Sequence, residues 1–160
     1  MNKYGILGWP LERSYSPVIH TFLLKHVSIE GKYELIRMNE INNKNIDQIN
    51  KSYSGYNVTI PYKEKILEVC EEAHLDVHVK KIGSVNTVKN KDGITSFYNT
   101  DYLGFLNFLE IINFNPEGRK IMILGSGGSS KSINYALNLI KSQATIISRT
   151  NKEEAISYQD

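Results

Sequence analysis

Lys63 and Asp101 are the side chains of this sequence whose types and settings are best suited to moving a proton. Lys63 follows Pro61 just inside a predicted helix N-terminus, where a cation is electrostatically disfavoured, and this makes it a better acid or base than a surface lysine. Asp101 follows Asn99 and Thr100 at the start of another predicted helix, where an acidic residue normally complements the helix dipole. Taken singly, each residue is more typical of a solvated helix start than of a catalytic group.

A glycine-rich segment, ILGSGGSSK at residues 123–131, lies between a predicted strand and a predicted helix. Glycine lets the backbone turn tightly and approach a pyrophosphate, while the helix N-terminus supplies free N–H groups. A plain tight turn is the alternative interpretation, but the flanking elements favour a nucleotide site. Its candidate cofactor-binding residues are Gly125, Ser126, Gly127, Gly128 and Ser129.

A second cofactor signal follows the next predicted strand, at Ser148, Arg149, Thr150 and Lys152. An NAD-binding sheet commonly has an acidic residue here for the ribose 2′-hydroxyl, whereas two cations suit the 2′-phosphate of NADP. Solvated loop charges are the alternative.

In the first half of the chain, the segment GYNVTIPYK at residues 55–63 sets polar Asn57 and Thr59 on one side of a strand, where both can face a cleft.

The elements that must hold these groups follow an alternating pattern. Strands are predicted at residues 3–7, 32–38, 56–60, 84–89, 94–98, 120–124 and 144–148. Helices are predicted from Ser16, whose hydroxyl can cap the first turn, over about 45–53, from Pro61 to about Ala73, from Asn99 or Thr100, and over 129–141.

This order predicts an α/β fold in two parts. Residues 1–113 form a mostly parallel domain with a hairpin at its edge, around Asp92 and Gly93, and an apolar linking helix that packs between two bodies. Residues 114–160 form a βαβ unit, the beginning of a dinucleotide-binding sheet.

Four segments taken together resemble the shikimate dehydrogenase family: GWPLERSYSPVIH at 8–20, GYNVTIPYK at 55–63, GSVNT at 83–87 and NTD at 99–101. Their order and spacing are similar to that family throughout the chain. The resemblance implies an N-terminal, mostly parallel substrate domain of residues 1–113, followed at 114–160 by the first part of a Rossmann domain that binds NADP. An open sheet of that kind normally has six strands, so the resemblance also implies on the order of 100 further residues.

The resemblance also implies roles for individual residues. Ser14 and Ser16 hold the carboxylate of shikimate, and Thr59, Asn86 and Asp101 contact its ring hydroxyls. Lys63 and Asp101 handle the proton in the reversible NADP-dependent conversion of 3-dehydroshikimate to shikimate, a step of chorismate and aromatic amino acid biosynthesis. The cofactor-binding residues are those of the glycine-rich turn and the 148–152 segment.

Some residues depart from the family pattern. Arg13 replaces a common histidine, Phe97 a usual glycine and Ser148 an asparagine. None of these changes removes a catalytic group, and Arg13 is expected to add attraction for the carboxylate. Two alternatives stay open: a quinate/shikimate dehydrogenase that uses NAD, and a shikimate-binding module without turnover.

Composition narrows the function classes. The net charge of +2, with 19 basic residues scattered among 17 acidic ones, argues against nucleic acid as a partner. No apolar run could span a membrane and no signal peptide is recognisable, which favours a cytoplasmic protein. Cys70 is the only cysteine, so it argues against a thiolate metal site and is expected to pack in the core. No metal is predicted, and the expected state is a monomer or homodimer.

Overall fold

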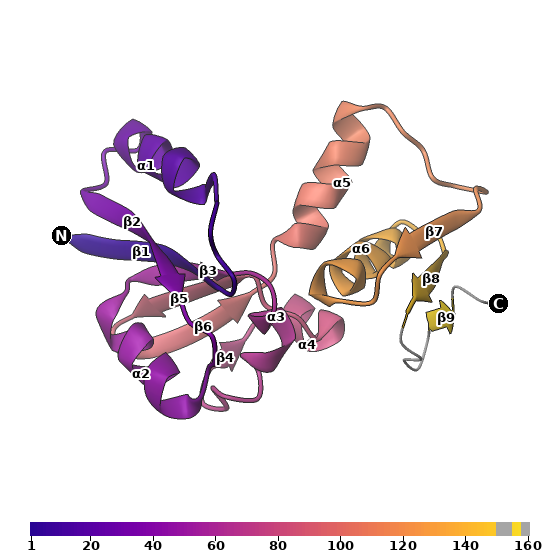
Figure 1. The fold of residues 1–160 in the computed structure, drawn as a ribbon. Coiled ribbons are helices and arrows are strands. Elements are labelled where there is room, and N and C mark those ends of the chain that lie inside the picture. The colour runs from indigo at the N-terminus through magenta and orange to yellow at the C-terminus, as the bar shows by residue number, and fades with distance from the viewer. Residues whose placement is uncertain (150–154, 158–160) are drawn as a thin grey trace.

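Two separate sheets organise the chain (Figure 1). The structure, a computed structural model, describes residues 1–149 and 155–157. The strands are β1 (Asn2–Gly8), β2 (Gly31–Arg37), β3 (Gly55–Val58), β4 (His74–Leu75), β5 (Thr87–Lys91), β6 (Ile94–Tyr98), β7 (Ile121–Leu124), β8 (Ala144–Ser148) and β9 (Ala155–Ser157). The helices are α1 (Ser16–His26), α2 (Asn43–Ser52), α3 (Tyr62–Lys65), α4 (Val77–Ile82), α5 (Asp101–Ile111) and α6 (Gly128–Leu139).

The first sheet has the strand order β2-β1-β3-β5-β6-β4. β1 runs parallel to both of its neighbours and β4 runs parallel to β6, whereas β5 is antiparallel to β3 and β6. The predicted α/β class and mostly parallel sheet are therefore confirmed. Asp92 and Gly93 both have positive φ angles, 52° and 77°, which a tight hairpin turn between β5 and β6 requires. The hairpin does not form the edge as predicted, because the two-residue β4 pairs with the outer side of β6.

Both faces of this sheet are covered. Successive strand residues point to opposite faces, so Leu7 of β1 enters the main core while its neighbour Ile6 joins a smaller cluster with Tyr33. The main core includes Ile46 and Ile49 of α2. Helix α1 packs against β2 on the opposite side of the sheet from α2 (Figure 1).

The helix predicted from Pro61 to Ala73 is wrong in length, since α3 ends at Lys65. The backbone bonds shorten from four residues at Ile66 to three at Leu67 and Glu68, and the chain leaves the helix in turns. Ile66, Leu67, Val69 and Cys70, whose spacing predicted the longer helix, still pack in or against the main core. Beyond α3 they do so from turns and not from one face of a helix.

One predicted helix cap differs from the structure, and at a second helix one of the two predicted caps, Asn99, is confirmed. The Ser16 hydroxyl does not cap α1; instead the Oγ of Ser14 accepts a hydrogen bond from the backbone N–H of Ser16 at 3.2 Å. At α5 the Thr100 side chain makes no capping bond, and the Oδ1 of Asn99 accepts the backbone N–H of Asp101 at 3.0 Å. In both places a polar side chain one or two residues earlier satisfies the free N–H group.

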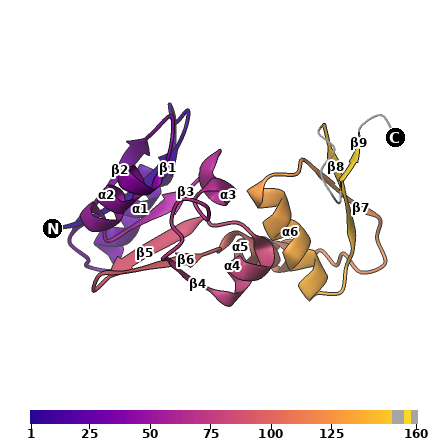
Figure 2. The ribbon, with the colours of Figure 1, turned by 90° about the horizontal axis from the view of Figure 1, so that it is seen from below.

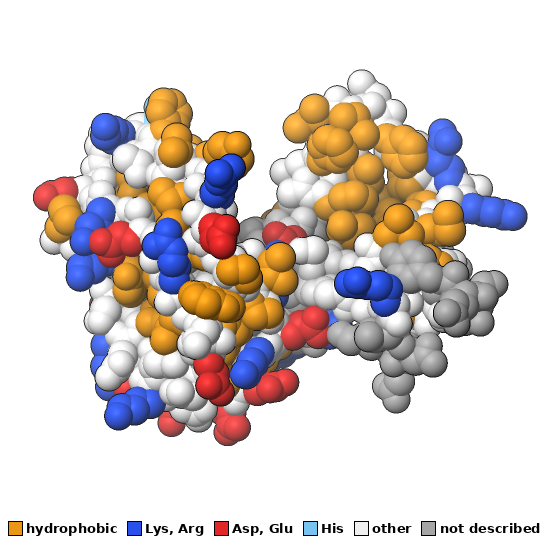
Figure 3. Space-filling model, in the orientation of Figure 1, with side chains coloured by type: hydrophobic (Ala, Val, Ile, Leu, Met, Phe, Trp, Pro, Cys, Tyr) orange, Lys and Arg blue, Asp and Glu red, His pale blue; other side chains and the backbone are white. Residues whose placement is uncertain are grey.

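Helices α4, α5 and α6 join the two sheets (Figure 2). Ile82, Tyr102 and Ala136 form their common apolar cluster, so the linking helix α5 packs against the second body as expected. Much of its apolar surface is nevertheless exposed, including Phe108 at 54% and Ile111 at 78%. Hydrophobic side chains gather over the region of α5, on one side of the notch between the two bodies (Figure 3).

The second sheet has the order β7-β8-β9, and all its strands are parallel. Helix α6 connects β7 to β8 and packs on both, which is the predicted βαβ unit. Within the described residues β7 pairs only with β8, and its side chains Met122 and Leu124 are 70% and 69% exposed.

Candidate active site

Helix α3 holds Lys63 through the buried residue that precedes it. Tyr62 is 2% exposed, and its hydroxyl donates to the carbonyl of Met38 at 2.7 Å. The backbone N–H of Val85 donates to the carbonyl of Lys63 at 2.7 Å. The main chain at Lys63 is therefore tied both to the core and to the segment before β5, so that its side chain leaves α3 in a fixed direction.

Lys63 and Asp101 form an ion pair, with 2.6 Å between the lysine Nζ and the carboxylate Oδ2. The side chains retain 17% and 29% of their exposure. The second carboxylate oxygen, Oδ1, accepts the side-chain amide of Asn86 at 2.7 Å. Charge-assisted hydrogen bonds of this length are strong and directional. Each carboxylate oxygen of Asp101 has one such partner and can still accept a hydrogen bond from a ligand.

Asn86 is itself held in a single orientation. Its Oδ1 accepts the backbone N–H of Thr100 and the hydroxyl of Thr87, both at 2.9 Å. A backbone N–H can only donate, so this contact identifies the oxygen side of the amide and directs the NH2 group to Asp101. Asn86 is 9% exposed, and its amide can turn away from Asp101 only by breaking several hydrogen bonds.

The two serines predicted to hold a carboxylate lie at the start of α1. Ser14 and Ser16 are partly buried and joined by the bond between the Ser14 Oγ and the Ser16 N–H. Thr59 follows β3, and its methyl group packs so closely under Gly8 that a Cβ there would overlap it. The structure thus brings Lys63, Asp101 and Asn86 into direct contact, and no hydrogen bond joins them directly to these three residues.

The glycine-rich turn connects β7 to α6 as predicted. Gly125 has a φ of 112°, a backbone conformation that residues other than glycine rarely adopt. The Oγ atoms of Ser126 and Ser148 lie 2.8 Å apart, which ties the turn to the end of β8. No side chain caps the first turn of α6 at Gly127, and an added Cβ at that glycine would meet nothing within 4 Å.

These features fit a phosphate group, because uncapped N–H groups at a helix N-terminus lie beside open space. Arg149 is exposed just after β8. Thr150 and Lys152, also predicted to bind the cofactor, lie outside the described residues.

The glycine-rich turn also touches the catalytic candidate, a contact that the sequence did not reveal. The Nζ of Lys63 donates to the Oγ of Ser129 at 3.2 Å, so one ammonium group joins the two bodies. A Cβ on Gly128 would lie 3.0 Å from the Cβ of Lys63 and would overlap the Oγ of Ser84. The start of α6 is therefore packed directly against Lys63.

Further polar contacts join the bodies beside this point. Lys131 of α6 forms an ion pair with Glu64 of α3 at 2.6 Å. The Nδ2 of the buried Asn99 donates to the Oγ of Ser132 at 2.9 Å and to the carbonyl of Ser84 at 2.8 Å. The contacts of Lys131 with Glu64 and of Asn99 with Ser132 span 67 and 33 residues, so local spacing carried no signal for them.

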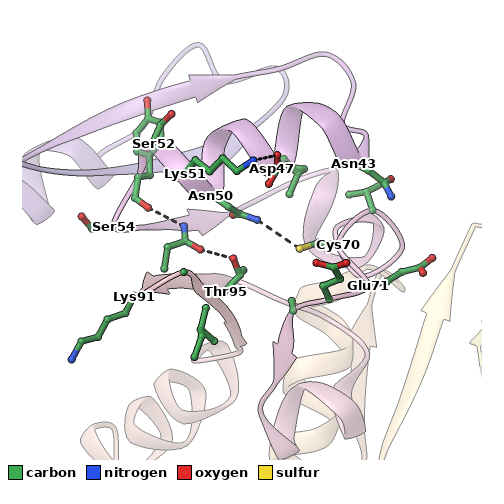
Figure 4. A pocket seen from close by; sticks show the side chains of 18 of the residues that line it. Asn43, Asp47, Asn50, Lys51, Ser52, Ser54, Cys70, Glu71, Lys91 and Thr95 are labelled. Carbon is green, nitrogen blue, oxygen red and sulfur yellow. Dashed lines mark hydrogen bonds and ion pairs between the residues drawn. The ribbon is translucent and has the colours of Figure 1, made fainter.

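A separate groove lies on the other side of the first domain, between α2, the 69–73 segment and the hairpin turn (Figure 4). None of the predicted site residues lines it. Cys70 lies in its wall, where the Nδ2 of Asn50 approaches the sulfur at 3.7 Å. Burial raises the pKa of the Cys70 thiol, which lowers its reactivity and agrees with the predicted packing role.

Known proteins with similar sequences decide the family. A family model described as the shikimate dehydrogenase substrate binding domain matches residues 6–88, more than half of the chain. The chain belongs to the shikimate dehydrogenase family. The family assignment drawn from the four segments is therefore confirmed.

Curated members of the shikimate dehydrogenase family match nearly the whole chain. A relative from Caldicellulosiruptor bescii, named shikimate dehydrogenase (NADP(+)), is 35% identical over 159 residues, which are 97% of this chain and 54% of the relative. One of the same name from Clostridium perfringens is 38% identical and matches 97% of this chain and 57% of its own length. The chain thus spans little more than half the length of these shikimate dehydrogenases.

Solved shikimate dehydrogenases share the fold. Shikimate dehydrogenase 1 from Peptoclostridium difficile is 31% identical with a TM-score of 0.88, over 99% of this chain and 61% of that one. The Thermus thermophilus enzyme, solved in complex with NADP(H) and shikimate, is 30% identical with a TM-score of 0.83, over 94% of this chain and 57% of that one. No helix in the described parts of this family member is long and apolar enough to cross a membrane, and no cluster of metal-ligating side chains occurs there.

Proposed function

We propose that this chain carries the substrate-binding side and the first part of the cofactor-binding side of an NADP-dependent shikimate dehydrogenase. The observation that carries the proposal is the contact between Lys63 and Asp101, 2.6 Å long, at the point where the glycine-rich turn meets the first domain. An enzyme that moves a hydride and a proton to one carbonyl group must bring its proton donor and its bound cofactor to that group, and this contact joins the two parts of the chain that would do so. The names of the curated relatives support the same activity.

In the reduction of 3-dehydroshikimate, the Lys63 ammonium hydrogen-bonds the ketone oxygen and gives it a proton as the carbon accepts hydride. NADPH supplies that hydride when it is bound. Asp101 holds the ammonium in line and, with Asn86, contacts the neighbouring ring hydroxyl. In the reverse direction the neutral amine of Lys63, held by Asp101, takes the proton of the 3-hydroxyl of shikimate, while carbon 3 gives up the hydride that a bound NADP+ would accept.

The remaining site residues bind and orient the substrate. Ser14 and Ser16 donate hydroxyl hydrogen bonds to the carboxylate at the start of α1, whose N-terminal dipole favours an anion. Thr59 contacts a ring hydroxyl from the end of β3. Alignment by several neutral donors contributes to rate because the reacting carbon is held at one distance from the cofactor.

On the cofactor side, Gly125, Ser126, Gly127, Gly128 and Ser129 take the pyrophosphate, and Ser148, Arg149, Thr150 and Lys152 take the adenosine ribose and its 2′-phosphate. The exposed guanidinium of Arg149 supports NADP over NAD, because a second negative charge gains from a cation there. The domain boundary at residue 113, the cytoplasmic location and the monomer or homodimer stay predictions.

Turnover measured with shikimate and quinate, each with NADP and NAD, tests the proposal. Oxidation is expected only for shikimate with NADP at an appreciable rate. Efficient quinate oxidation with NAD would overturn the substrate and cofactor assignments. Calorimetric shikimate binding without any NADPH absorbance would instead favour a binding module.

A further inference from the structure

Tyr33 connects two strands that flank β1. Tyr33 of β2 pairs with Tyr4 of β1, and Asn57 of β3 pairs with Ile6 of β1. Because Tyr4 and Ile6 are two residues apart in one strand, Tyr33 and Asn57 lie on the same face of the sheet. The ring of Tyr33 reaches across β1, and its hydroxyl donates to the Oδ1 of Asn57 at 2.6 Å. The residue is 8% exposed, so the hydroxyl has been removed from water and depends on this partner.

A second contact fixes the ring itself. His20 of α1 stacks on Tyr33 with 4.3 Å between the ring centroids and 3° between the ring planes. Burial raises the pKa of Tyr33 and keeps its hydroxyl protonated, so the hydroxyl can donate to Asn57. Helix α1 is thus joined to the sheet through one phenol group.

From Asn57 the hydrogen bonds continue to the Lys63–Asp101 pair. The Nδ2 of Asn57 donates to the carbonyl of Asn86 at 3.3 Å and to the Oγ1 of Thr87 at 3.4 Å. Thr87 donates to the Oδ1 of Asn86, whose Nδ2 donates to Asp101. One connected set of bonds therefore runs from Tyr33, against which α1 packs, to the proton-handling end of the site.

We propose that Tyr33 is a positioning residue of the substrate site: its ring, stacked on His20 of α1, and its hydroxyl, bonded to Asn57, hold α1 and β3 at a fixed separation, so that one ligand meets the carboxylate anchor and the Asn86–Asp101 edge together. The inference rests on the proposed function, since it takes shikimate as the ligand. Tyr33 itself acts through these neighbours and handles no proton.

Tyr33→Phe removes the hydroxyl while keeping the stacked ring. The chain offers a matched control in Tyr56→Phe, because Tyr56 is also buried in this sheet and its hydroxyl donates to an asparagine, Asn50, at 2.8 Å, outside the site. Calorimetry with shikimate is expected to give about a fivefold weaker Kd for Tyr33→Phe, the equivalent of one hydrogen bond, and an unchanged Kd for Tyr56→Phe. The midpoint temperature of thermal unfolding is expected to fall by a similar amount in both variants.

A double-variant cycle shows whether Tyr33 acts through Asn57. Asn57→Ala is expected to weaken shikimate binding, and adding Tyr33→Phe to it is expected to cost less than twofold more, because the shared bond is already lost. Asn57→Ala also serves alone if Tyr33→Phe does not fold. Equal Kd values for the unaltered chain and Tyr33→Phe overturn the inference, as do fully additive losses. If the unaltered chain does not bind shikimate, the proposed function fails as well.

Discussion

Adding one methyl group at Gly128 tests how tightly the two bodies pack against each other. A Cβ there would lie 3.0 Å from the Cβ and 3.4 Å from the Cδ of Lys63, and would overlap the Oγ of Ser84. Contacts this tight force side chains or backbone to move. Gly128→Ala is therefore expected to lower the free energy of unfolding by about 1–3 kcal/mol, the usual cost of overpacking, and to displace Lys63.

Urea unfolding of the 160-residue chain, followed by circular dichroism, measures this loss. Gly127→Ala is the matched control in the same turn, because its added Cβ meets nothing within 4 Å and its φ of −85° suits alanine. It changes only an N-cap residue, so the expected loss is below about 1 kcal/mol. Equal losses in the two variants would refute the packing argument.

A second substitution identifies the obstructing atom. The Oγ of Ser84 has no hydrogen-bond partner among the described residues, so Ser84→Ala removes the obstruction without breaking a bond. Combined with Gly128→Ala, it should recover about 1 kcal/mol of the loss. Strict additivity of the two changes would show that Ser84 is not what the new methyl group meets.

Three further outcomes are expected. Lys63→Ala in a full-length version should lower turnover about 100-fold or more with a smaller effect on substrate binding, and a change confined to KM would contradict its role. Arg13→Ala should weaken shikimate binding and reduce its salt dependence; unchanged values would remove Arg13 from carboxylate attraction. Burial lowers the pKa of His20 below 6.5, so its contribution to stability is complete above about pH 6.5 and declines as the pH falls through the folded-state pKa. Nuclear magnetic resonance titration of His20 and a flatter acid limb of the stability curve in His20→Gln would check this sign.

The local patterns predicted most strands and helices because each depends on nearby residues. The hairpin turn at Asp92 and Gly93 is an example, since positive φ angles favour those residue types wherever they occur. The start of α5 near Asp101 was also predicted, and Asn99, one of its two predicted caps, accepts the N–H group of Asp101. Boundaries and caps depend on single hydrogen bonds, so they were predicted less well than the elements.

Long-range contacts account for what the sequence missed. The length of α3 is decided by where Ile66 and its neighbours meet the core, and helical periodicity does not contain that information. Tyr33 has the pattern of an ordinary strand residue, because its partner Asn57 lies 24 residues further on and across another strand. The contact of Lys63 with Ser129 spans 66 residues and exists only because α6 packs against α3.

Among the described residues β7 has a strand partner on one side only, which has a consequence for the 160-residue chain in solution. Backbone N–H and C=O groups along such an edge accept a further strand, and the exposed Met122 and Leu124 beside them add apolar area. Concentrated samples are therefore expected to self-associate through this side. Light scattering is expected to rise with protein concentration while the first domain stays folded.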